Sequence, residues 1–343
     1  MKAIVVTRFE GPDALELRDV PEPSPSPDEV LVNVEAVGVN FADVRGAMGL
    51  YPGGPKPPYI AGREFAGTVA DTGQPVMGYT QQGACAARIA MHRDFLWPQP
   101  QGWNSILSAA FPVNYFTAWL VYWKAGVLPG ASTPSDAKSA SAGGPGLSAP
   151  DKTPVGSRTP VRILIHAAAG GVGTAAVQLG HLMGFETFGT ASSDEKLERL
   201  RALGLNHAIN YTREDYEQKV KELTSGEGVD VVFESLAGEH TAKSLRCCAF
   251  LGRVVLFGSS SGERPKFDTL AMYERALSAH GLWLSRLARN RALIDQAIAW
   301  MQPWIDRGKL KPVIGAKFPL EAAADAFRLL AGRKSFGKIV LTV

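Results

Sequence analysis

The sequence predicts an α/β protein that combines a doubly wound parallel sheet with a smaller β-rich domain. The first observation is a short branched apolar run at residues 161–166, which leads into the glycine-rich turn AAGGVG and then into the helix-like run TAAVQLGHLM. The second is the alternation of strand-like and helix-like segments that continues from there to residue 284. Such alternation requires parallel strands with helices on both faces of the sheet. A nucleotide bound to such a sheet lies at the carboxyl ends of its strands.

The composition is that of an ordinary globular protein. The chain has 343 residues, of which 45% are hydrophobic and 20% charged, and this length is sufficient for two domains with cores. A net charge of +3 without a Lys/Arg stripe argues against a nucleic-acid partner, and no apolar run reaches the length of a membrane span. Three cysteines make no disulfide framework and suit a reducing compartment. We therefore expect a cytoplasmic protein without a membrane partner.

The N-terminal part predicts a small, irregular β domain. Alternating apolar and polar residues mark its strands, and Pro-rich or Gly-rich stretches separate them. The predicted strands cover residues 2–7, 29–38 and 63–69, with a short helix over 40–48 and a Gly/Pro-rich loop over 49–58. Residues 105–124 then predict one or two buried helices.

Residues 131–160 form an insertion of mainly Ser, Ala, Pro, Gly and Thr without an aromatic residue. Such a segment buries too little to repay the entropy of ordering. It predicts a flexible surface insertion, and a functional lid is the alternative.

The sheet continues after the glycine-rich turn. The predicted strands are 187–190, 208–211, 229–233, 253–257 and 277–284, and the helices between them are 194–203, 213–223 and 239–248. Ser192 and Glu195 have the spacing of a capping box. A helix over 294–306 and a closing strand over 337–343 follow.

The glycine-rich turn itself predicts a dinucleotide site. Gly170 lets the backbone approach a pyrophosphate, and Gly173 lets the helix pack closely on the strand, with Gly171 and Val172 between them. The N–H groups and dipole at the start of the helix favour anionic phosphates. An ordinary tight turn is the alternative.

With these residues laid out, the chain resembles the medium-chain dehydrogenase/reductase superfamily along nearly its whole length. It is most similar to the zinc-independent, zeta-crystallin-like quinone oxidoreductases, and to their branch with the vesicle amine transport protein homologues. The segments VGVNFADVRGAMGLYPG, AGREFAGTV, FPVNYFTAW, HAAAGGVGTAAVQLG and FGKIVLTV carry the resemblance. It implies a GroES-like catalytic domain from residues 1–116 and 285–343, with a Rossmann domain inserted at 117–284.

The resemblance also bears on zinc. The related alcohol dehydrogenases have cysteine where this chain has Asn40 and histidine where it has Arg63, and their four-cysteine lobe is missing here. A single cysteine in the N-terminal half makes no Cys/His zinc set. We therefore expect no metal.

The end of the second strand of the sheet predicts NADPH rather than NADH. An NAD enzyme has an acidic residue there to hold the ribose, whereas this chain has Ser192 and then Lys196, which suit a 2′-phosphate. Asp194 argues the other way, although a charge in the first turn of a helix explains it more simply. The resemblance adds Tyr211 beside the phosphate. A solvated Lys196 and a core Tyr211 are the alternatives.

For the nicotinamide end the resemblance implies a pocket with a hydrogen bond from Thr117 to the carboxamide and with Lys338 near the phosphates or ribose. Asn40 as a cap of its helix and Thr117 as a buried helix residue are the structural alternatives. The other implied members of the pocket are Asn40, Phe257, Gly258, Ser259 and Trp283.

The implied activity is NADPH-dependent reduction of quinones or α,β-unsaturated carbonyls. Tyr51, in the loop GLYPGG, matches a tyrosine that faces the substrate in the family and is the candidate proton donor, while packing is its alternative role. Water as the proton source is a second option for a quinol. An NADPH-binding structural or regulatory protein with little turnover is the alternative function.

The last strand of the sheet predicts the assembly. Residues 276–284 (ALSAHGLWL) are apolar and lie at the expected sheet edge, where an exposed strand pairs with another chain. In the resembling family this strand pairs about a two-fold axis. We expect a homodimer that acts on a small molecule, and a monomer with a covered edge is the alternative.

Overall fold

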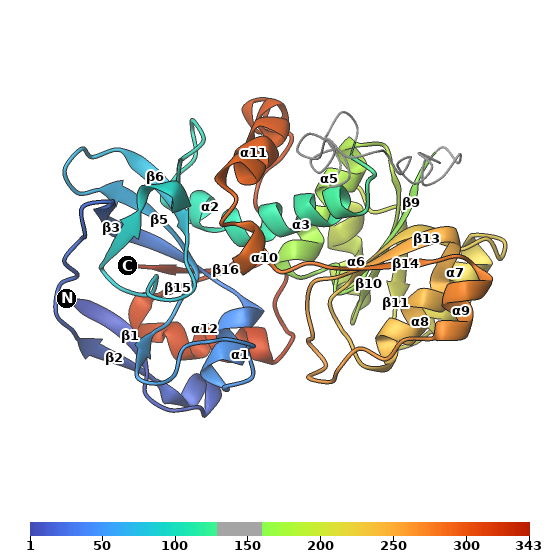
Figure 1. The fold of residues 1–343 in the computed structure, drawn as a ribbon, viewed down its shortest axis with the longest axis horizontal. Helices are drawn as coiled ribbons and strands as arrows, with labels where there is room; N and C mark the ends of the chain where they lie inside the picture. Colours follow the sequence, from blue (N-terminus) through green and yellow to red (C-terminus); the bar gives the residue numbers. More distant parts are fainter. Residues whose placement is uncertain (129–159) are drawn as a thin grey trace, which may run out of the picture. The chain divides into compact units, whose positions relative to one another are not determined.

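The structure, a computed structural model, describes residues 1–128 and 160–343 and divides into two units (Figure 1). Unit 1 consists of residues 1–117, 170–175 and 284–343, and unit 2 consists of residues 118–169 and 176–283. The predicted insertion at 131–160 lies outside the described residues except for Pro160. No helix in the described part of the chain is long and apolar enough to cross a membrane.

Unit 2 contains the predicted parallel sheet. Its order is β11-β10-β9-β12-β13-β14, and every neighbouring pair is parallel. The strands are β9 (Arg162–Ile165), β10 (Glu186–Ala191), β11 (His207–Asn210), β12 (Val229–Glu234), β13 (Cys248–Leu256) and β14 (Ser278–Gly281). The chain winds outward in one direction from β9 and in the other from β12, so the topological switch point lies between these two strands.

Helices alternate with these strands, because each strand-helix pair buries one apolar face of the sheet. They are α5 (Gly171–Leu182), α6 (Asp194–Arg201), α7 (Tyr216–Leu223), α8 (Glu239–Cys247) and α9 (Thr269–Glu274). Branched and aromatic residues from strands and helices form one buried cluster, which includes Leu164, Phe188, Val220, Val232 and Leu245.

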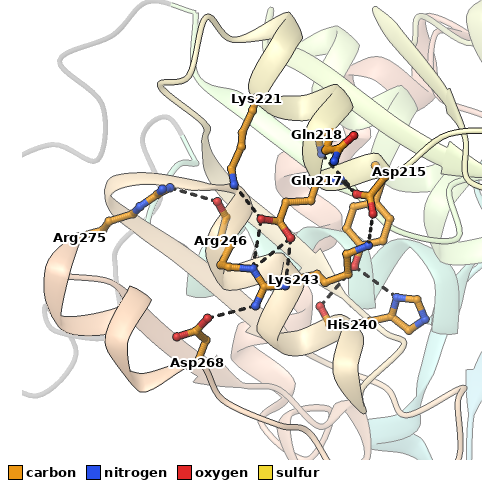
Figure 2. Close-up of polar contacts among 10 residues, drawn as sticks. Asp215, Glu217, Gln218, Lys221, His240, Lys243, Arg246, Asp268 and Arg275 are labelled. Atoms are coloured by element: carbon orange, nitrogen blue, oxygen red, sulfur yellow. Dashed lines mark hydrogen bonds and ion pairs between the residues drawn. The ribbon is translucent and has the colours of Figure 1, made fainter.

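A network of charged side chains joins α7, α8 and α9 (Figure 2). Arg246 of α8 binds Glu217 of α7 at 3.0 Å and Asp268, the N-cap of α9, at 3.1 Å. Lys243 binds Asp215, the N-cap of α7, at 2.6 Å. Each partly exposed pair contributes little alone, but a network fixes the helices against one another. It therefore holds these three helices together on unit 2.

Unit 1 is built from both ends of the chain. In its seven-stranded sheet, β16 (Lys338–Thr342) pairs antiparallel with β3 (Glu29–Val39), with Ile339 opposite Val39 and Leu341 opposite Val37. The other strands of this sheet are β5 (Glu64–Val69), β6 (Pro75–Tyr79), β7 (Arg88–His92), β8 (Leu96–Pro98) and β15 (Ile314–Pro319). The smaller sheet contains β1 (Lys2–Val6), β2 (Leu15–Asp19) and β4 (Tyr59–Ile60).

The helices of unit 1 include the two that the sequence predicts near residues 40 and 294. The helices of this unit within the described residues are α1 (Phe41–Ala47), α2 (Ser105–Ala109), α3 (Pro112–Lys124), α10 (Leu284–Leu287), α11 (Arg291–Asp306) and α12 (Ala323–Ala331). Helix α3 continues into unit 2. Short 3₁₀ turns occupy Gly11–Ala14, Arg93–Phe95 and Leu320–Ala322.

The structure corrects two local predictions. The strand predicted over 277–284 covers only Ser278–Gly281, and Leu284 begins a helix. The N-cap of α6 is Ser193, whose side chain accepts from Lys196 N, and the predicted capping box of Ser192 and Glu195 is therefore wrong. The N-cap lies one residue later than predicted, because the backbone stays extended through Ser193 before α6 begins.

Candidate active site and cofactor-binding residues

The glycine-rich turn lies between β9 and α5, as predicted. Gly170 makes an isolated parallel bridge to Gly337, and α5 begins at Gly171. A Cβ on Gly171 would lie 2.6 Å from the Asn114 amide, so any other residue at this position would displace that side chain. The first turn of α5, a helix of twelve residues, is therefore rich in glycine. Its backbone N–H groups are donors of the kind that bind a pyrophosphate.

At the end of β10, the carboxylate of Asp194 is already engaged. It accepts from Asn210 Nδ2 at 2.6 Å and pairs with Arg213 at 2.5 Å. Asp194 also lies in the first turn of α6, where a negative charge is favourable. The simpler explanation of this residue, a first-turn helix charge, is therefore confirmed.

The residues predicted to bind the 2′-phosphate follow two neighbouring strands. Ser192 follows β10, Tyr211 follows β11, and Tyr211 N donates to Ala191 O at 3.2 Å. Lys196 is half-buried on α6, and burial lowers the pKa of its ammonium. Tyr211 is 43% exposed, so its alternative role as a core residue is wrong.

Arg213 is a cation that the sequence analysis missed at this end of the sheet. Its guanidinium is largely exposed and reaches Asp194 across the ends of β10 and β11. The sequence signal for Arg213 was its position two residues after Tyr211, which is predicted to lie beside the phosphate.

The segment predicted for the nicotinamide follows β13 and is bonded to the turn after β12. Phe257 N donates to Glu234 O at 3.0 Å, and Ser260 N donates to Ser235 O at 2.9 Å. Ser259 Oγ donates to Glu263 O at 3.1 Å, and a Cβ on Gly258 would lie 3.0 Å from Ser235 O. Trp283 follows β14, outside the strand, and is 39% exposed.

Unit 1 contributes a buried polar cluster around Asn40, the N-cap of α1. Asn40 Nδ2 donates to Glu64 Oε1 at 2.9 Å, and Asn40 Oδ1 accepts from Lys338 Nζ at 2.7 Å. Lys338 also forms an ion pair with Glu64, which accepts from Val113 N at 2.7 Å. Asn40 does cap its helix, and its side chain also joins β16 to β5.

Glu64 belongs to this buried cluster and was not predicted from the sequence. It is fully buried and binds two of the predicted site residues at once. A carboxylate in a strand of otherwise apolar residues was the signal. Lys338 is only 3% exposed, so its charge acts within this cluster.

The second half of this cluster reaches Tyr51. Arg63 pairs with Asp43 at 3.3 Å, and its guanidinium carbon lies 3.9 Å from the centre of the Tyr51 ring. Burial raises the pKa of Asp43 to about 6, and the Arg63 charge opposes that shift. The Tyr51 hydroxyl lies 3.4 Å from Ser285 Oγ. The hydroxyl of a tyrosine is one of the side-chain groups that act as general acids, and the Arg63 guanidinium over the ring holds this side chain in place.

The Tyr51 hydroxyl belongs to a short series of hydroxyl groups in unit 1. Ser285 Oγ lies 2.7 Å from the hydroxyl of Tyr79, and burial raises the pKa of Tyr79 to about 12. Thr117 is the other residue of unit 1 that was predicted to contact the nicotinamide. It lies on α3 and is 5% exposed, which agrees with its alternative role as a buried helix residue. Each unit therefore groups its own share of the predicted residues: Asn40, Tyr51 and Lys338 in unit 1, and the strand-end segments in unit 2.

The donor set does not fit zinc at the position where related dehydrogenases bind it. Asn40 and Arg63 supply an amide and a guanidinium there, and neither is a zinc ligand. Within residues 1–128 and 160–343, no three His, Cys, Asp or Glu side chains are grouped so as to hold a metal ion. Cys85 is buried, and its burial raises the pKa of the thiol.

Two protein families match parts of this chain. Residues 26–92 match the family described as alcohol dehydrogenase GroES-like domain, and residues 171–302 match the family described as zinc-binding dehydrogenase. The first match lies in unit 1, and the second begins at the glycine-rich turn and includes most of unit 2.

Similar proteins cover nearly the whole chain. The crystal structure of the quinone oxidoreductase from Thermus thermophilus, also determined with NADPH, has a TM-score of 0.81 and 34% identity and covers 100% of both chains. The synaptic vesicle membrane protein VAT-1 homolog of Rattus norvegicus is 31% identical over 99% of this chain and 84% of its own. The quinone oxidoreductase of Mus musculus is 30% identical over 99% of this chain and 97% of its own. The chain therefore belongs to the medium-chain dehydrogenase/reductase superfamily, in the group of the quinone oxidoreductases and the VAT-1 homologs.

Proposed function

We propose that this protein is a zinc-independent reductase that uses NADPH to reduce quinones or α,β-unsaturated carbonyls. The observation that carries the proposal is the similarity over both full chains to a quinone oxidoreductase that was also determined with NADPH. The glycine-rich start of α5 and the cation-bearing ends of β10 and β11 support it. Turnover of a simple ortho- or para-quinone with NADPH tests it. Tight NADPH binding without turnover of any quinone or enone would instead support the structural or regulatory alternative.

In this proposal the start of α5 holds the pyrophosphate, with Gly170, Gly171, Val172 and Gly173 as its backbone. Ser192, Lys196 and Tyr211 hold the 2′-phosphate, because hydroxyl groups and an ammonium are its natural donors. Arg213 adds a second cation at the same strand ends, and its pairing with Asp194 balances the charge of that carboxylate.

We expect Lys196→Ala to raise the KM for NADPH selectively, by about tenfold to 100-fold. The loss of one charge-assisted hydrogen bond is worth about 1–3 kcal/mol, and NADH lacks the phosphate that makes it. Steady-state kinetics with both cofactors measures the change, and Lys219→Ala on α7, whose ammonium pairs with Glu222 instead, is the control. Equal use of NADPH and NADH by the wild type would contradict the assignment of Ser192 and Lys196.

At the substrate end, the cofactor supplies a hydride, and the residues of this chain position the substrate and move the proton. Asn40, Thr117, Trp283 and the Phe257–Ser259 segment are the proposed nicotinamide contacts, and Lys338 is proposed to lie near the phosphates or ribose. Reduction of an enone leaves an enolate that needs a proton. Tyr51 donates it from its hydroxyl, and Arg63 over the ring positions the side chain.

We also propose that the protein forms a homodimer through β14. This strand is the last in the sheet of unit 2 and pairs only with β13 within the described residues. Leu282 N donates to Leu256 O of β13, so the alternation along the strand directs the N–H groups of Ala279 and Gly281 away from β13. No backbone acceptor in residues 1–128 or 160–343 is recorded for these groups, and in this proposal they pair with a second copy of the chain.

Ala279→Pro is therefore expected to convert the dimer to a monomer. Proline removes an outward N–H and is tolerated on the free side of an edge strand. Light scattering at micromolar concentration should give twice the chain mass of 36.7 kDa for the wild type and for the control Ala279→Val, and a single-chain mass for the proline variant. A monomeric wild type would contradict the proposal.

A further inference from the structure

Four buried polar side chains form a hydrogen-bonded chain at the carboxyl edge of the sheet in unit 2. Thr190 Oγ1 lies 3.3 Å from His166 Nδ1, His166 Nε2 lies 3.0 Å from Ser244 Oγ, and Ser244 Oγ donates to Glu234 Oε2 at 2.5 Å. All four residues are at most 2% exposed. The proposed reaction uses none of them, and Ser244 is too buried to meet a substrate.

The chain has a defined direction. The Glu234 carboxylate only accepts, so the hydroxyl hydrogen of Ser244 points to it, and Ser244 Oγ accepts from His166 Nε2–H. Burial lowers the pKa of His166 and so favours the neutral ring, while the Glu234 carboxylate, 3.9 Å from Nε2, opposes that shift. In the neutral ring Nδ1 accepts from Thr190. The ring therefore has its proton on Nε2.

The members of this chain belong to the elements around the switch point. His166 follows β9 directly, Glu234 ends β12, Thr190 is on β10, and Ser244 is on α8. β9 and β12 are the two strands on either side of the switch point, next to which such sheets bind their ligand. The four hydrogen-bonded side chains are therefore buried beneath the strand ends at that point. The Tyr216 ring of α7 packs edge-on against His166 with 4.9 Å between ring centres.

Glu234 also organises the turn that follows β12. Its Oε1 accepts from Leu236 N at 2.6 Å and from Ala237 N at 3.0 Å, and Ala237 has a positive φ of 64°. Backbone carbonyl groups of this turn accept hydrogen bonds from Ser260 N and Ser261 N, which directly follow the Phe257–Ser259 segment. On the other side, Ala168 of the glycine-rich turn donates to Thr190 O at 3.0 Å.

We propose that Thr190, His166, Ser244 and Glu234 are positioning residues that fix the turn after β12 relative to the turn after β9, and thereby set the affinity for the nucleotide cofactor. The identity of that cofactor, NADPH, rests on the proposed function. The hydrogen bonds that join these four side chains form within unit 2 and need no ligand.

The first test breaks the chain. Ser244→Ala, or Thr190→Val where the first variant does not fold, should raise the Kd for NADPH about tenfold, measured by fluorescence titration of the whole protein, because residues that orient ligand-binding groups typically have effects of about 10–100-fold. Asp230→Asn is the control, because Asp230 is also buried on β12 but at its opposite end, where it accepts from Arg162 N. It should lower the melting temperature without a change in Kd. An unchanged Kd in the chain-breaking variant would overturn the proposal.

The second test reverses the chain. In Glu234→Gln the amide oxygen still accepts from Leu236 and Ala237, so the amide NH₂ faces Ser244, whose hydroxyl must then donate to His166 Nε2. The histidine proton should move to Nδ1, and ¹⁵N chemical shifts of the labelled apoprotein would report the change. An unchanged tautomer would overturn the directed chain. Failure of the wild type to bind NADPH would overturn the proposed function and the cofactor role together, while the tautomer of the apoprotein still decides the chain.

Discussion

Lys338→Met is expected to lower the free energy of unfolding by about 3–5 kcal/mol, the range for removing one partner of a buried ion pair. Lys338 is 3% exposed, pairs with the fully buried Glu64 and donates to Asn40 Oδ1 at 2.7 Å. Methionine has a similar length but no charge, so the fully buried Glu64 would lose the cation that pairs with it. Urea denaturation of the purified variant measures the loss.

Two further variants show whether the loss comes from the buried charge. Lys317→Met, on the neighbouring strand β15, is exposed and should leave stability within about 0.5 kcal/mol of the wild type. Adding Glu64→Gln to Lys338→Met should recover part of the stability, because it removes the uncompensated charge. A Lys338→Met variant as stable as the wild type would contradict the account of this cluster.

Tyr51→Phe is expected to lower kcat with an enone by about 100-fold or more, in the range of general acid catalysis. The enolate left by hydride transfer needs a proton, and the Tyr51 hydroxyl, with Arg63 over its ring and Ser285 at 3.4 Å, is the proposed source. The Kd for NADPH should not change, because phenylalanine keeps the ring. Steady-state kinetics and fluorescence titration separate the two effects.

The control for this variant is Tyr59→Phe. Tyr59 is a tyrosine of β4 that lines a small cavity with Asp43 and Arg63, and it has no assigned role in the reaction. It should keep kcat within about threefold, as is usual for a residue outside the reacting groups. Equal kcat values for Tyr51→Phe and the wild type would indicate that water supplies the proton.

The sequence allowed the parallel sheet to be predicted because its signals are local. A strand, a glycine turn and a helix follow one another at residues 161–183, and the same pattern recurs along unit 2. Strands β6, β8 and β15 were not predicted, since their pairing is set by distant segments and not by a local pattern. The strand at 278–281 was predicted too long because an apolar sequence does not show where a strand gives way to a helix.

Several residues of the candidate site could be named from the sequence, but the contacts between them could not. Asn40 and Lys338 were both named from the resemblance, yet their hydrogen bond joins residues 298 positions apart and depends on the register of β16 against β3. Glu64, which binds both, was missed because a single carboxylate in an apolar strand has no periodicity. The stacking of Arg63 on Tyr51 is likewise a contact that only the fold reveals.

Single-turnover mixing of the NADPH-loaded protein with a simple ortho-quinone, without oxygen, tests the central proposal most directly. Loss of the NADPH absorbance and formation of the hydroquinone should occur together, with one NADPH consumed for each quinone reduced, because a hydride carries both electrons. The same experiment with NADH should proceed more slowly. NADPH that binds tightly but stays unoxidised with this quinone, with a para-quinone and with an enone would contradict the proposal that this protein is a reductase.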